Sequence, residues 1–266
     1  MSSVWNEPTL ARELAGQRFG RRVLCFDSLE STNDKALELL EQGEPEGALV
    51  LAEEQTRGRG RRERLWDSPS RLGIYASLVL RPTLPPGLLP LVSLAFAVGT
   101  AATLRGEGLE KVALKWPNDL LLGERKLAGI LAEARSDGVQ RGLVVGLGLN
   151  VNQDESDFPV TLRATATSLR RSSGRPWDRV KILKGVLRRC EAEYDDLQEN
   201  GPEDLLLRYE EHGAFRRGSE LEVDSGSGVC RGRFAGLGAS GELLLDTGGE
   251  DPVAFHFGEV RRVTRP

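Results

Sequence analysis

Residues 57–66 read RGRGRRERLW, and the fold and function assigned to the rest of the chain depend on how this stretch is explained. Five of its first eight residues are arginine, although the chain of 266 residues has a formal net charge of −4. An RNA-binding segment, an import signal and a loop that closes over phosphates could all have this composition. Because duplex binders need a broad basic face, one local basic cluster on an acidic chain favours a small anionic ligand.

The overall composition is that of an ordinary globular protein, with 39% hydrophobic and 29% charged residues. Three widely spaced cysteines predict neither a disulfide framework nor a metal site, and two histidines are too few for a histidine-rich metal centre. The first residues lack the features of a signal peptide, and we recognise no long apolar run. We therefore expect a cytoplasmic protein without a membrane span.

Apolar runs alternate with turn signals over the first two hundred residues. We predict strands at residues 22–27, 48–52, 73–80 and 112–114, a hairpin turning at residues 123–124, and a strand over 142–152 that breaks up at its glycines. We predict helices that begin near residue 31 and cover residues 88–106, 178–197 and 202–212. A further short helix is expected within residues 10–14.

The pattern of apolar segments and turn residues changes after Gly213. Short strand-like pieces are separated by the turn signals DSGSG, GLGASG and DTGGED, which predict a small all-β unit. We place a boundary near Ala214, so that residues 1–213 form one domain and residues 214–266 a second, smaller one.

Four polar clusters interrupt the apolar segments, namely STND (31–34), QTRGRGRRERLW (55–66), KWPND with RKLAGI (115–130) and GLGLNVN (146–152). Each is unremarkable alone. The glycines of the arginine stretch lack the following Gly-Lys-Ser/Thr of a Walker loop, and GLGLN lacks the third glycine of a dinucleotide fingerprint. Trp116 is open to two interpretations, a ligand contact or packing under the hairpin.

Together and in this order, the clusters resemble the biotin protein ligase family. The family's hallmarks are Ser-Thr-Asn, Gly-Arg-Gly-Arg-Arg-Gly-Arg with Trp, Lys-Trp-Pro-Asn-Asp, Lys-Leu-Ala-Gly-Ile-Leu and Gly-x-Gly-x-Asn. The resemblance covers about residues 22–262 and has one visible departure, Glu63, where the family has glycine. It implies an α+β fold with a mixed, mostly antiparallel sheet flanked by helices, like that of class II synthetases. A small C-terminal SH3-like β-barrel completes it.

The resemblance also implies activation of biotin by ATP and transfer to a lysine of a biotin carboxyl carrier protein, with Mg²⁺ as an accompanying ion. It assigns to biotin the residues Ser31, Thr32, Asn33, Gln55, Gly58, Arg59, Arg61, Lys126, Gly129 and Gly146. It assigns to ATP the residues Arg61, Arg62, Arg64, Trp66, Asn118, Lys126 and Asn150. The expected catalytic residues are Arg61, Lys126 and Asp119, where Asp119 is either an acceptor for the attacking lysine or a Mg²⁺ contact. Gly148 would join Gly129 and Gly146 in a flat strand floor.

The arginines suit this chemistry. A carboxylate that attacks an α-phosphate is already ionised, so the obstacle is repulsion between two anions. Arginine side chains placed between them remove that obstacle, because the planar guanidinium pairs with both carboxylate and phosphate oxygens.

Three alternatives remain open. A lipoate ligase would share the fold but would lack the arginine loop. An RNA-binding module would leave KWPND and KLAGI unexplained. A ligase that is also a DNA-binding repressor would need an N-terminal domain, for which the residues before Ser31 are too few, so we expect a short form that binds no DNA. A monomer and a homodimer are both compatible with the sequence.

Overall fold

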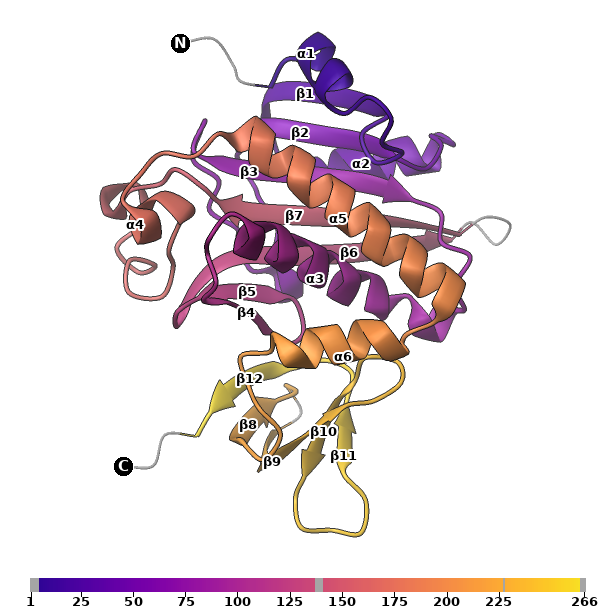
Figure 1. The fold of residues 1–266 in the computed structure, drawn as a ribbon, viewed down its shortest axis with the longest axis vertical. Coiled ribbons are helices and arrows are strands. Elements are labelled where there is room, and N and C mark those ends of the chain that lie inside the picture. Colours follow the sequence, from indigo (N-terminus) through magenta and orange to yellow (C-terminus); the bar gives the residue numbers. More distant parts are fainter. Residues whose placement is uncertain (1–4, 137–140, 227, 264–266) are drawn as a thin grey trace.

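The computed structural model describes residues 5–136, 141–226 and 228–263. In these residues the strands form one seven-stranded and one five-stranded sheet (Figure 1). The strands are β1 (Arg22–Leu29), β2 (Ala48–Gln55), β3 (Gly73–Leu80), β4 (Val112–Lys115), β5 (Asp119–Leu122), β6 (Arg125–Ser136), β7 (Arg141–Asn150), β8 (Glu220–Asp224), β9 (Val229–Leu237), β10 (Leu243–Asp246), β11 (Val253–Phe255) and β12 (Glu259–Arg262). The helices are α1 (Glu7–Glu13), α2 (Thr32–Glu41), α3 (Pro90–Gly106), α4 (Leu169–Ser173), α5 (Arg179–Asn200) and α6 (Glu203–Glu211), with short 3₁₀ turns η1 (Arg61–Glu63), η2 (Pro86–Leu88) and η3 (Glu155–Asp157).

The large sheet has the order β1-β2-β3-β7-β6-β5-β4. Only its β1–β2 pair is parallel, so the prediction of a mixed, mostly antiparallel sheet is confirmed. The prediction that the strand over 142–152 breaks up at its glycines is wrong. Strand β7 is continuous through Gly146 and Gly148, because β3 on one side and β6 on the other pair with it and hold the glycines extended.

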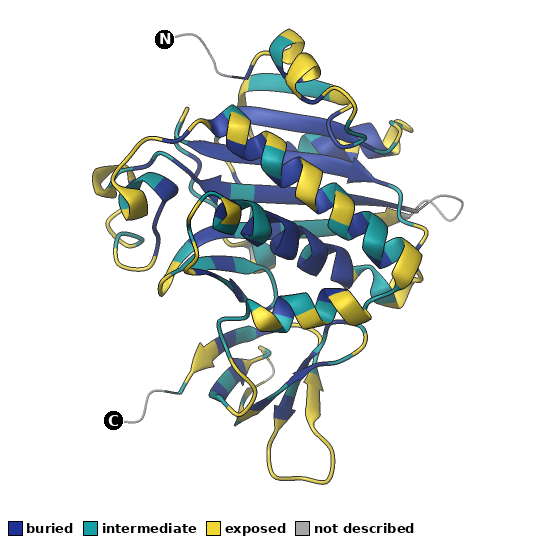
Figure 2. Ribbon diagram, viewed as in Figure 1, coloured by how far each residue is buried: buried dark blue, intermediate teal, exposed yellow. Residues whose placement is uncertain are grey.

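Helices cover both faces of this sheet. Helices α3 and α5 cross one face, while α2 lies on the other (Figure 1). Strand β2 illustrates why both faces of the sheet need a covering helix. Its consecutive side chains point to opposite faces, and both sets are apolar. Leu49 and Leu51 join the main core, whereas Ala48 and Val50 join a second apolar cluster with α2. The buried strands therefore form the centre of a three-layer arrangement (Figure 2).

Helix α3 is apolar on nearly every side because it lies inside the core. A segment from Pro86 to Gly106 is long and apolar enough to cross a membrane by length and composition, but 61% of its most apolar window is buried in the protein. Gly99 allows the closest approach to α5, since a Cβ there would lie 2.8 Å from the Cys190 backbone nitrogen. The prediction of a buried helix at this position is confirmed.

The second sheet has the order β11-β10-β9-β8-β12 and joins the first through α6 (Figure 1). The Leu114 amide donates to the His212 carbonyl at 2.8 Å, and the Ala214 amide donates to the Leu114 carbonyl at 2.7 Å. Trp116 is 4% exposed, and its indole N–H donates to the Gly241 carbonyl at 2.8 Å. Trp116 thus packs against the second sheet, and it also lines the cavity described below, so the structure leaves both interpretations of this residue open. The division at Ala214 stays a prediction, although β8 to β12 all follow Gly213.

Candidate active site

A cavity of about 530 Å³ lies beneath the arginine-rich stretch, within the range of roughly 300–1,000 Å³ that is usual for small-molecule sites. Strands β5, β6 and β7 contribute to its lining, as do the first turn of α2, residues 158–166 and residues 258–260 of the second sheet. The structure brings together nearly all the residues predicted to bind ligand, namely Ser31, Thr32, Asn33, Gln55, Arg59, Arg61, Arg62, Arg64, Trp66, Asn118, Asp119, Lys126, Gly129, Gly146 and Asn150. Gly58 is the exception and does not line the cavity.

The arginine loop, residues 57–66, folds into a small hairpin over this cavity. Arg59 and Leu65 form an antiparallel bridge, and the Gly60 amide donates to the Arg64 carbonyl at 2.7 Å. Gly58 is needed at the base of the hairpin, because a Cβ there would lie 2.4 Å from the Trp66 carbonyl oxygen. The described backbone includes Glu63 within η1, whereas its side chain lies outside what the structure describes.

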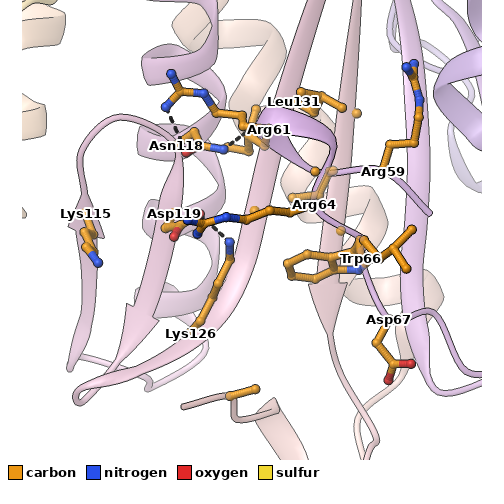
Figure 3. Close-up of a pocket in the computed structure, with 18 of the residues that line it drawn as sticks. Arg59, Arg61, Arg64, Trp66, Asp67, Lys115, Asn118, Asp119, Lys126 and Leu131 are labelled. Carbon is orange, nitrogen blue, oxygen red and sulfur yellow. Dashed lines mark hydrogen bonds and ion pairs between the residues drawn. The ribbon is translucent and has the colours of Figure 1, made fainter. Parts of the chain in front are cut away.

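The loop's arginines reach different parts of the molecule. Arg64 pairs with Glu259 of β12 at 2.5 Å, and this contact lowers the pKa of the Glu259 carboxyl. Arg61 donates to Asn118 Oδ1 at 3.5 Å (Figure 3). Burial, followed by the repulsion of Arg62, lowers the pKa of Arg61, although a guanidinium stays charged at neutral pH. The loop thus places permanent positive charge in the cavity.

Lys126 stands in the middle of the cavity (Figure 3). Its Nζ pairs with Asp119 Oδ1 at 2.6 Å and lies 5.3 Å from the centroid of the Trp66 ring. Its backbone lies near the start of β6, where the Lys126 amide donates to the Thr165 carbonyl at 2.7 Å. Lys126 is therefore fixed by its backbone and oriented by an acid and an aromatic ring.

The described residues contain no group of three histidine, cysteine or acidic side chains that could hold a metal ion by themselves. Mg²⁺ commonly binds through one or two carboxylates together with phosphate oxygens and water. Asp119 has one oxygen on Lys126, and its other oxygen suits such a nucleotide-borne ion; Asp67, Glu124 and Glu259 are further carboxylates in the lining of the cavity.

Glycines form the floor beneath Trp66. A Cβ on Gly148 would lie 2.4 Å from the indole, and one on Gly129 would lie 3.2 Å from it. The third predicted floor glycine, Gly146, lies instead beneath Asn33, whose Oδ1 would be 2.0 Å from an added Cβ. The floor is flat because two protein side chains, Trp66 and Asn33, already lie on it.

Asn118 and Asn150 line the cavity with amide groups that the protein itself engages. Asn150 donates to the Thr167 carbonyl at 3.0 Å and accepts from Gln153 at 3.2 Å. Asn118 donates to the Ile130 carbonyl at 2.7 Å, which joins the KWPND segment to β6. Both asparagines shape the wall of the cavity next to the loop.

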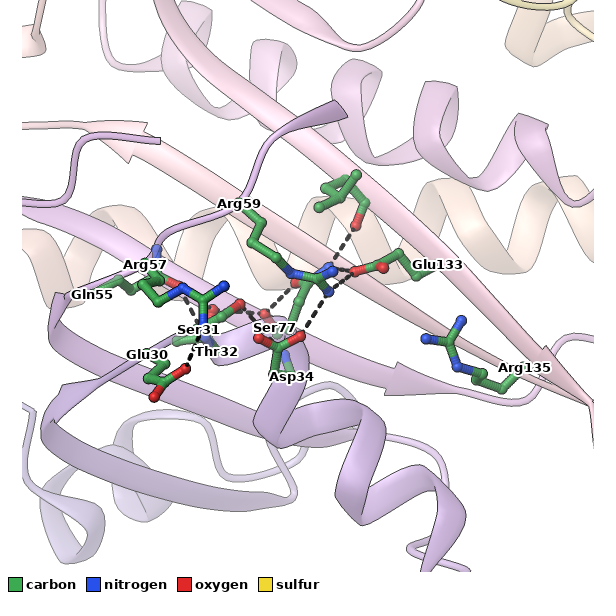
Figure 4. Close-up of polar contacts among 12 residues, drawn as sticks. Glu30, Ser31, Thr32, Asp34, Gln55, Arg57, Arg59, Ser77, Glu133 and Arg135 are labelled. Carbon is green, nitrogen blue, oxygen red and sulfur yellow. Dashed lines mark hydrogen bonds and ion pairs between the residues drawn. The ribbon is translucent and has the colours of Figure 1, made fainter. Parts of the chain in front are cut away.

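The opposite end of the cavity is lined by neutral polar groups from α2 and β2 (Figure 4). The Thr32 backbone N–H and hydroxyl lie 2.8 and 3.0 Å from Gln55 Oε1, and Gln55 Nε2 donates to Ser68 Oγ at 2.9 Å. Ser31 caps α2 by accepting from the Asp34 amide at 3.4 Å, which leaves its hydroxyl hydrogen available. This end suits a ligand group that both donates and accepts hydrogen bonds, such as a cyclic urea.

Arg59 does not point its charge at an open part of the cavity. Its guanidinium pairs with Glu133 at 2.6 Å and with Asp34 at 2.8 Å (Figure 4). Arg59 therefore ties the loop to β6 and α2. Because its guanidinium is engaged in these pairs, the biotin contact expected of Arg59 would have to come from its backbone groups.

Several lining residues escaped sequence analysis. Asp67 faces the cavity next to Trp66, and burial raises the pKa of its carboxyl. Phe158 and Leu162 approach from the segment after β7, and Glu259 approaches from the second sheet. Asp67 follows the arginine loop directly but belongs to no motif, and Phe158, Leu162 and Glu259 reach the cavity only through the order of strands and the docking of the second sheet.

The comparisons with known proteins agree with this geometry. The model of the "Biotin/lipoate A/B protein ligase family" matches residues 25–150 of this chain. The Biotin--[acetyl-CoA-carboxylase] ligase of Mycobacterium tuberculosis is 32% identical over 255 residues, which cover 93% of this chain and 92% of that protein. The bifunctional ligase/repressor BirA of Bacillus subtilis is 37% identical over 86% of this chain and 70% of its own length.

A solved structure shows the same fold. The biotin protein ligase of Aquifex aeolicus, in complex with biotin and ATP, superposes with a TM-score of 0.79 at 30% identity. The match covers 91% of this chain and 100% of that one. With the cationic loop, the lysine and the neutral polar end gathered in one cavity, the chain belongs to the biotin/lipoate A/B protein ligase family and is, within it, a biotin protein ligase.

Proposed function

We propose that this chain joins biotin to ATP as biotinyl-5′-AMP and then transfers the biotinyl group to a lysine of a biotin carboxyl carrier protein. The observation that carries the proposal is the cavity itself, in which a neutral polar end and a cationic centre are both present. The biotin ureido ring suits the end formed by Ser31, Thr32 and Gln55. The biotin carboxylate and the ATP α-phosphate suit the centre near Arg61 and Lys126.

In the first step, a biotin carboxylate oxygen attacks the α-phosphorus, a phosphorus–oxygen bond to the β-phosphate breaks, and pyrophosphate leaves. Two unit charges about 4 Å apart repel by roughly 4 kcal/mol at an effective dielectric constant near 20. Lys126 and Arg61 offset that repulsion and stabilise the charge that develops on the α-phosphate. Arg62 and Arg64 then suit the departing phosphates.

In the second step, a neutral lysine amine of the carrier attacks the acyl carbon, and AMP leaves as the amide forms. About one lysine in a thousand is neutral at pH 7.4 if its pKa is near 10.4. Asp119 is our candidate to accept the surplus proton, because it is the carboxylate beside Lys126 in the centre of the site. An ordered loop also shields the reactive anhydride from water.

The names of two relatives support an acetyl-CoA carboxylase carrier as the partner. The proteins of Mycobacterium tuberculosis and Paracoccus denitrificans are both named Biotin--[acetyl-CoA-carboxylase] ligase. The same names favour biotin over lipoate as the acyl group, as does the arginine loop. We further propose that the enzyme works in the cytoplasm, as a monomer or homodimer, without binding DNA.

Exchange of labelled pyrophosphate into ATP tests the first step directly. Wild type should catalyse biotin-dependent exchange, and Lys126→Ala should lose it by about 100- to 1,000-fold, as removal of one oriented electrostatic group does in comparable sites. Lys184→Ala, which removes an exposed lysine on α5, serves as the control. The absence of exchange by the wild-type protein would refute the proposed activation of biotin.

A further inference from the structure

Asp67 is a half-buried carboxylate of the cavity wall to which the protein supplies no donor. Two other acids of the lining are paired with cations, Asp119 with Lys126 and Glu259 with Arg64. Within the part of the chain that the structure describes, no hydrogen bond or ion pair reaches the Asp67 carboxylate, and burial raises its pKa. An acceptor left open in this way needs a donor from water or from a bound ligand.

Tyr75 lies close enough for the charge of Asp67 to act on it. Burial, followed by the charge of Asp67, raises the pKa of the Tyr75 hydroxyl. The single hydrogen of that hydroxyl is already used, because it is donated to the Pro69 carbonyl oxygen at 3.0 Å. Tyr75 is also buried within β3 and cannot turn toward Asp67. Asp67 therefore keeps its capacity to accept for a group that enters the cavity.

Asp67 lies in a different part of the cavity from the cationic centre. In Figure 3, Trp66 lies between Lys126 and Asp67. Lys126 Nζ is 5.3 Å from the centroid of the Trp66 ring, and Asp67 lies on the other side of that ring in the same view. A ligand held by a phosphate at Lys126 must therefore extend past Trp66 to reach Asp67.

Few groups of the two substrates can donate a hydrogen bond to a carboxylate. Biotin donates through its ureido N–H groups, which suit the other end of the cavity, at Ser31, Thr32 and Gln55. The phosphates of ATP are anionic acceptors, which Asp67 repels. The remaining donors of ATP are the 6-amino group of adenine and the two ribose hydroxyls.

The 6-amino group fits the position of Asp67 better than the ribose hydroxyls do. The ribose is joined to the α-phosphate through a single carbon, so it stays near Lys126 and Arg61 when the phosphate lies there. The 6-amino group is the nucleoside donor furthest from the phosphates, and Asp67 lies beyond Trp66 as seen from Lys126 (Figure 3). The order of groups along ATP thus matches the order of residues along the cavity.

We propose that Asp67 is a specificity-determining residue for the nucleotide, whose carboxylate accepts a hydrogen bond from the 6-amino group of adenine. This inference rests on the proposed function. A purine without the amine would cover the Asp67 carboxylate and give it no donor in place of water, which is unfavourable. A site built around such a hydrogen bond therefore selects against nucleotides that lack the donor.

The test is biotin-dependent exchange of labelled pyrophosphate into ATP and into purine riboside 5′-triphosphate, which lacks only the amino group. For wild type, kcat/KM should be about tenfold or more higher with ATP, the scale of one hydrogen bond to a charged group. Asp67→Ala should lose about tenfold with ATP and change less than about twofold with the analogue. If the analogue supports no exchange, its inhibition constant against ATP gives the same comparison.

Glu124→Ala is the matched control, because Glu124 is another carboxylate of the lining, at the turn between β5 and β6. This variant should keep the wild-type ratio of kcat/KM between the two nucleotides. Asp67→Asn separates hydrogen bonding from charge, since its amide oxygen still accepts. It should keep more of the preference for ATP than Asp67→Ala does, and it serves as the test variant if Asp67→Ala does not fold.

Three results would overturn the proposal. An equal loss with both nucleotides in the Asp67 variants would assign Asp67 to phosphate-borne Mg²⁺ or to the structure of the loop. A loss with ATP that vanishes with 2′-deoxyATP or 3′-deoxyATP would assign it to a ribose hydroxyl. An unchanged kcat/KM for ATP in Asp67→Ala would show that it makes no contact with the nucleotide. The absence of exchange by wild type would instead refute the proposed function, so the two failures are distinguishable.

Discussion

The ammonium group of Lys126 lies 2.6 Å from a carboxylate oxygen of Asp119 at the centre of the cavity. The pairing joins neighbouring antiparallel strands, since Asp119 begins β5 and Lys126 lies at the start of β6. A lysine held this way loses little side-chain freedom when an anion binds, because its position is already defined.

Asp119→Asn should affect the two chemical steps differently. The amide keeps the shape of the side chain but cannot take a proton, so transfer to the carrier lysine should slow more than adenylation, by about tenfold or more. Single-turnover transfer from preformed biotinyl-5′-AMP, beside pyrophosphate exchange, measures the two steps separately. Wild-type rates in both assays would make Asp119 a structural residue.

Gly148→Ala should weaken nucleotide binding through Trp66. The new methyl group would lie 2.4 Å from the indole, so the ring must leave the strand floor. We expect the KM for ATP to rise about tenfold while the biotin dissociation constant, measured alone, changes little. Gly106→Ala, at the end of α3 with open space around it, is the control. An unchanged KM for ATP would mean that Trp66 does not border the nucleotide.

The Arg64–Glu259 pair should make loop order depend on pH. The pair depresses the pKa of Glu259, so its stabilising contribution is present above the ordinary value of 4.5 and is lost as pH falls through the lower, folded-state value. Because Arg64 is largely exposed, the contribution is at most about 1 kcal/mol.

Amide hydrogen exchange of the loop, corrected for intrinsic rates, measures this effect. Glu259→Gln should exchange up to about fivefold faster than wild type at pH 7 and should show no further acceleration on acidification. Glu222→Gln, which removes a similar pair with Arg231 in the second sheet, should match wild type in the loop. Equal loop exchange in wild type and Glu259→Gln would show that the pair does not order the loop.

The buried pair between Glu53 and Arg179 should matter for stability. The two side chains are 1% and 4% exposed and lie 2.7 Å apart. Glu53→Gln leaves a buried guanidinium without its counter-charge, so the free energy of unfolding should fall by about 3–5 kcal/mol. Urea denaturation measures this fall, with Glu13→Gln, from the exposed pair with Lys184, expected to change it by less than about 0.5 kcal/mol.

Much of the fold could be predicted from local pattern. Helix α2 begins where the sequence indicates, with Ser31 as its cap, helix α5 covers most of the expected range, and the apolar runs became strands at the expected places. The continuity of β7 could not be predicted, because isolated glycines usually weaken a strand and here two neighbouring strands compensate.

Residues of the candidate site could be predicted where they belong to recognisable motifs. Contacts that only the tertiary structure creates could not be predicted. Arg61, Lys126 and Trp66 were expected to share one site, and all three line the same cavity. The partnership of Glu133 with Arg59 joins residues 74 positions apart through the order of the sheet, and Asp67 carries no motif signal at all. Sequence spacing contains no information on such contacts until the strand order is known.

Residues 258–260 complete the wall of the cavity, and Trp116 contacts the unit built around the second sheet through a hydrogen bond to Gly241. A fragment ending near residue 213 would keep the motifs that identify the family and yet present an active centre open on one side. Inhibitor screens and chimeric enzymes built on such a fragment would therefore select for a site that the intact protein does not have.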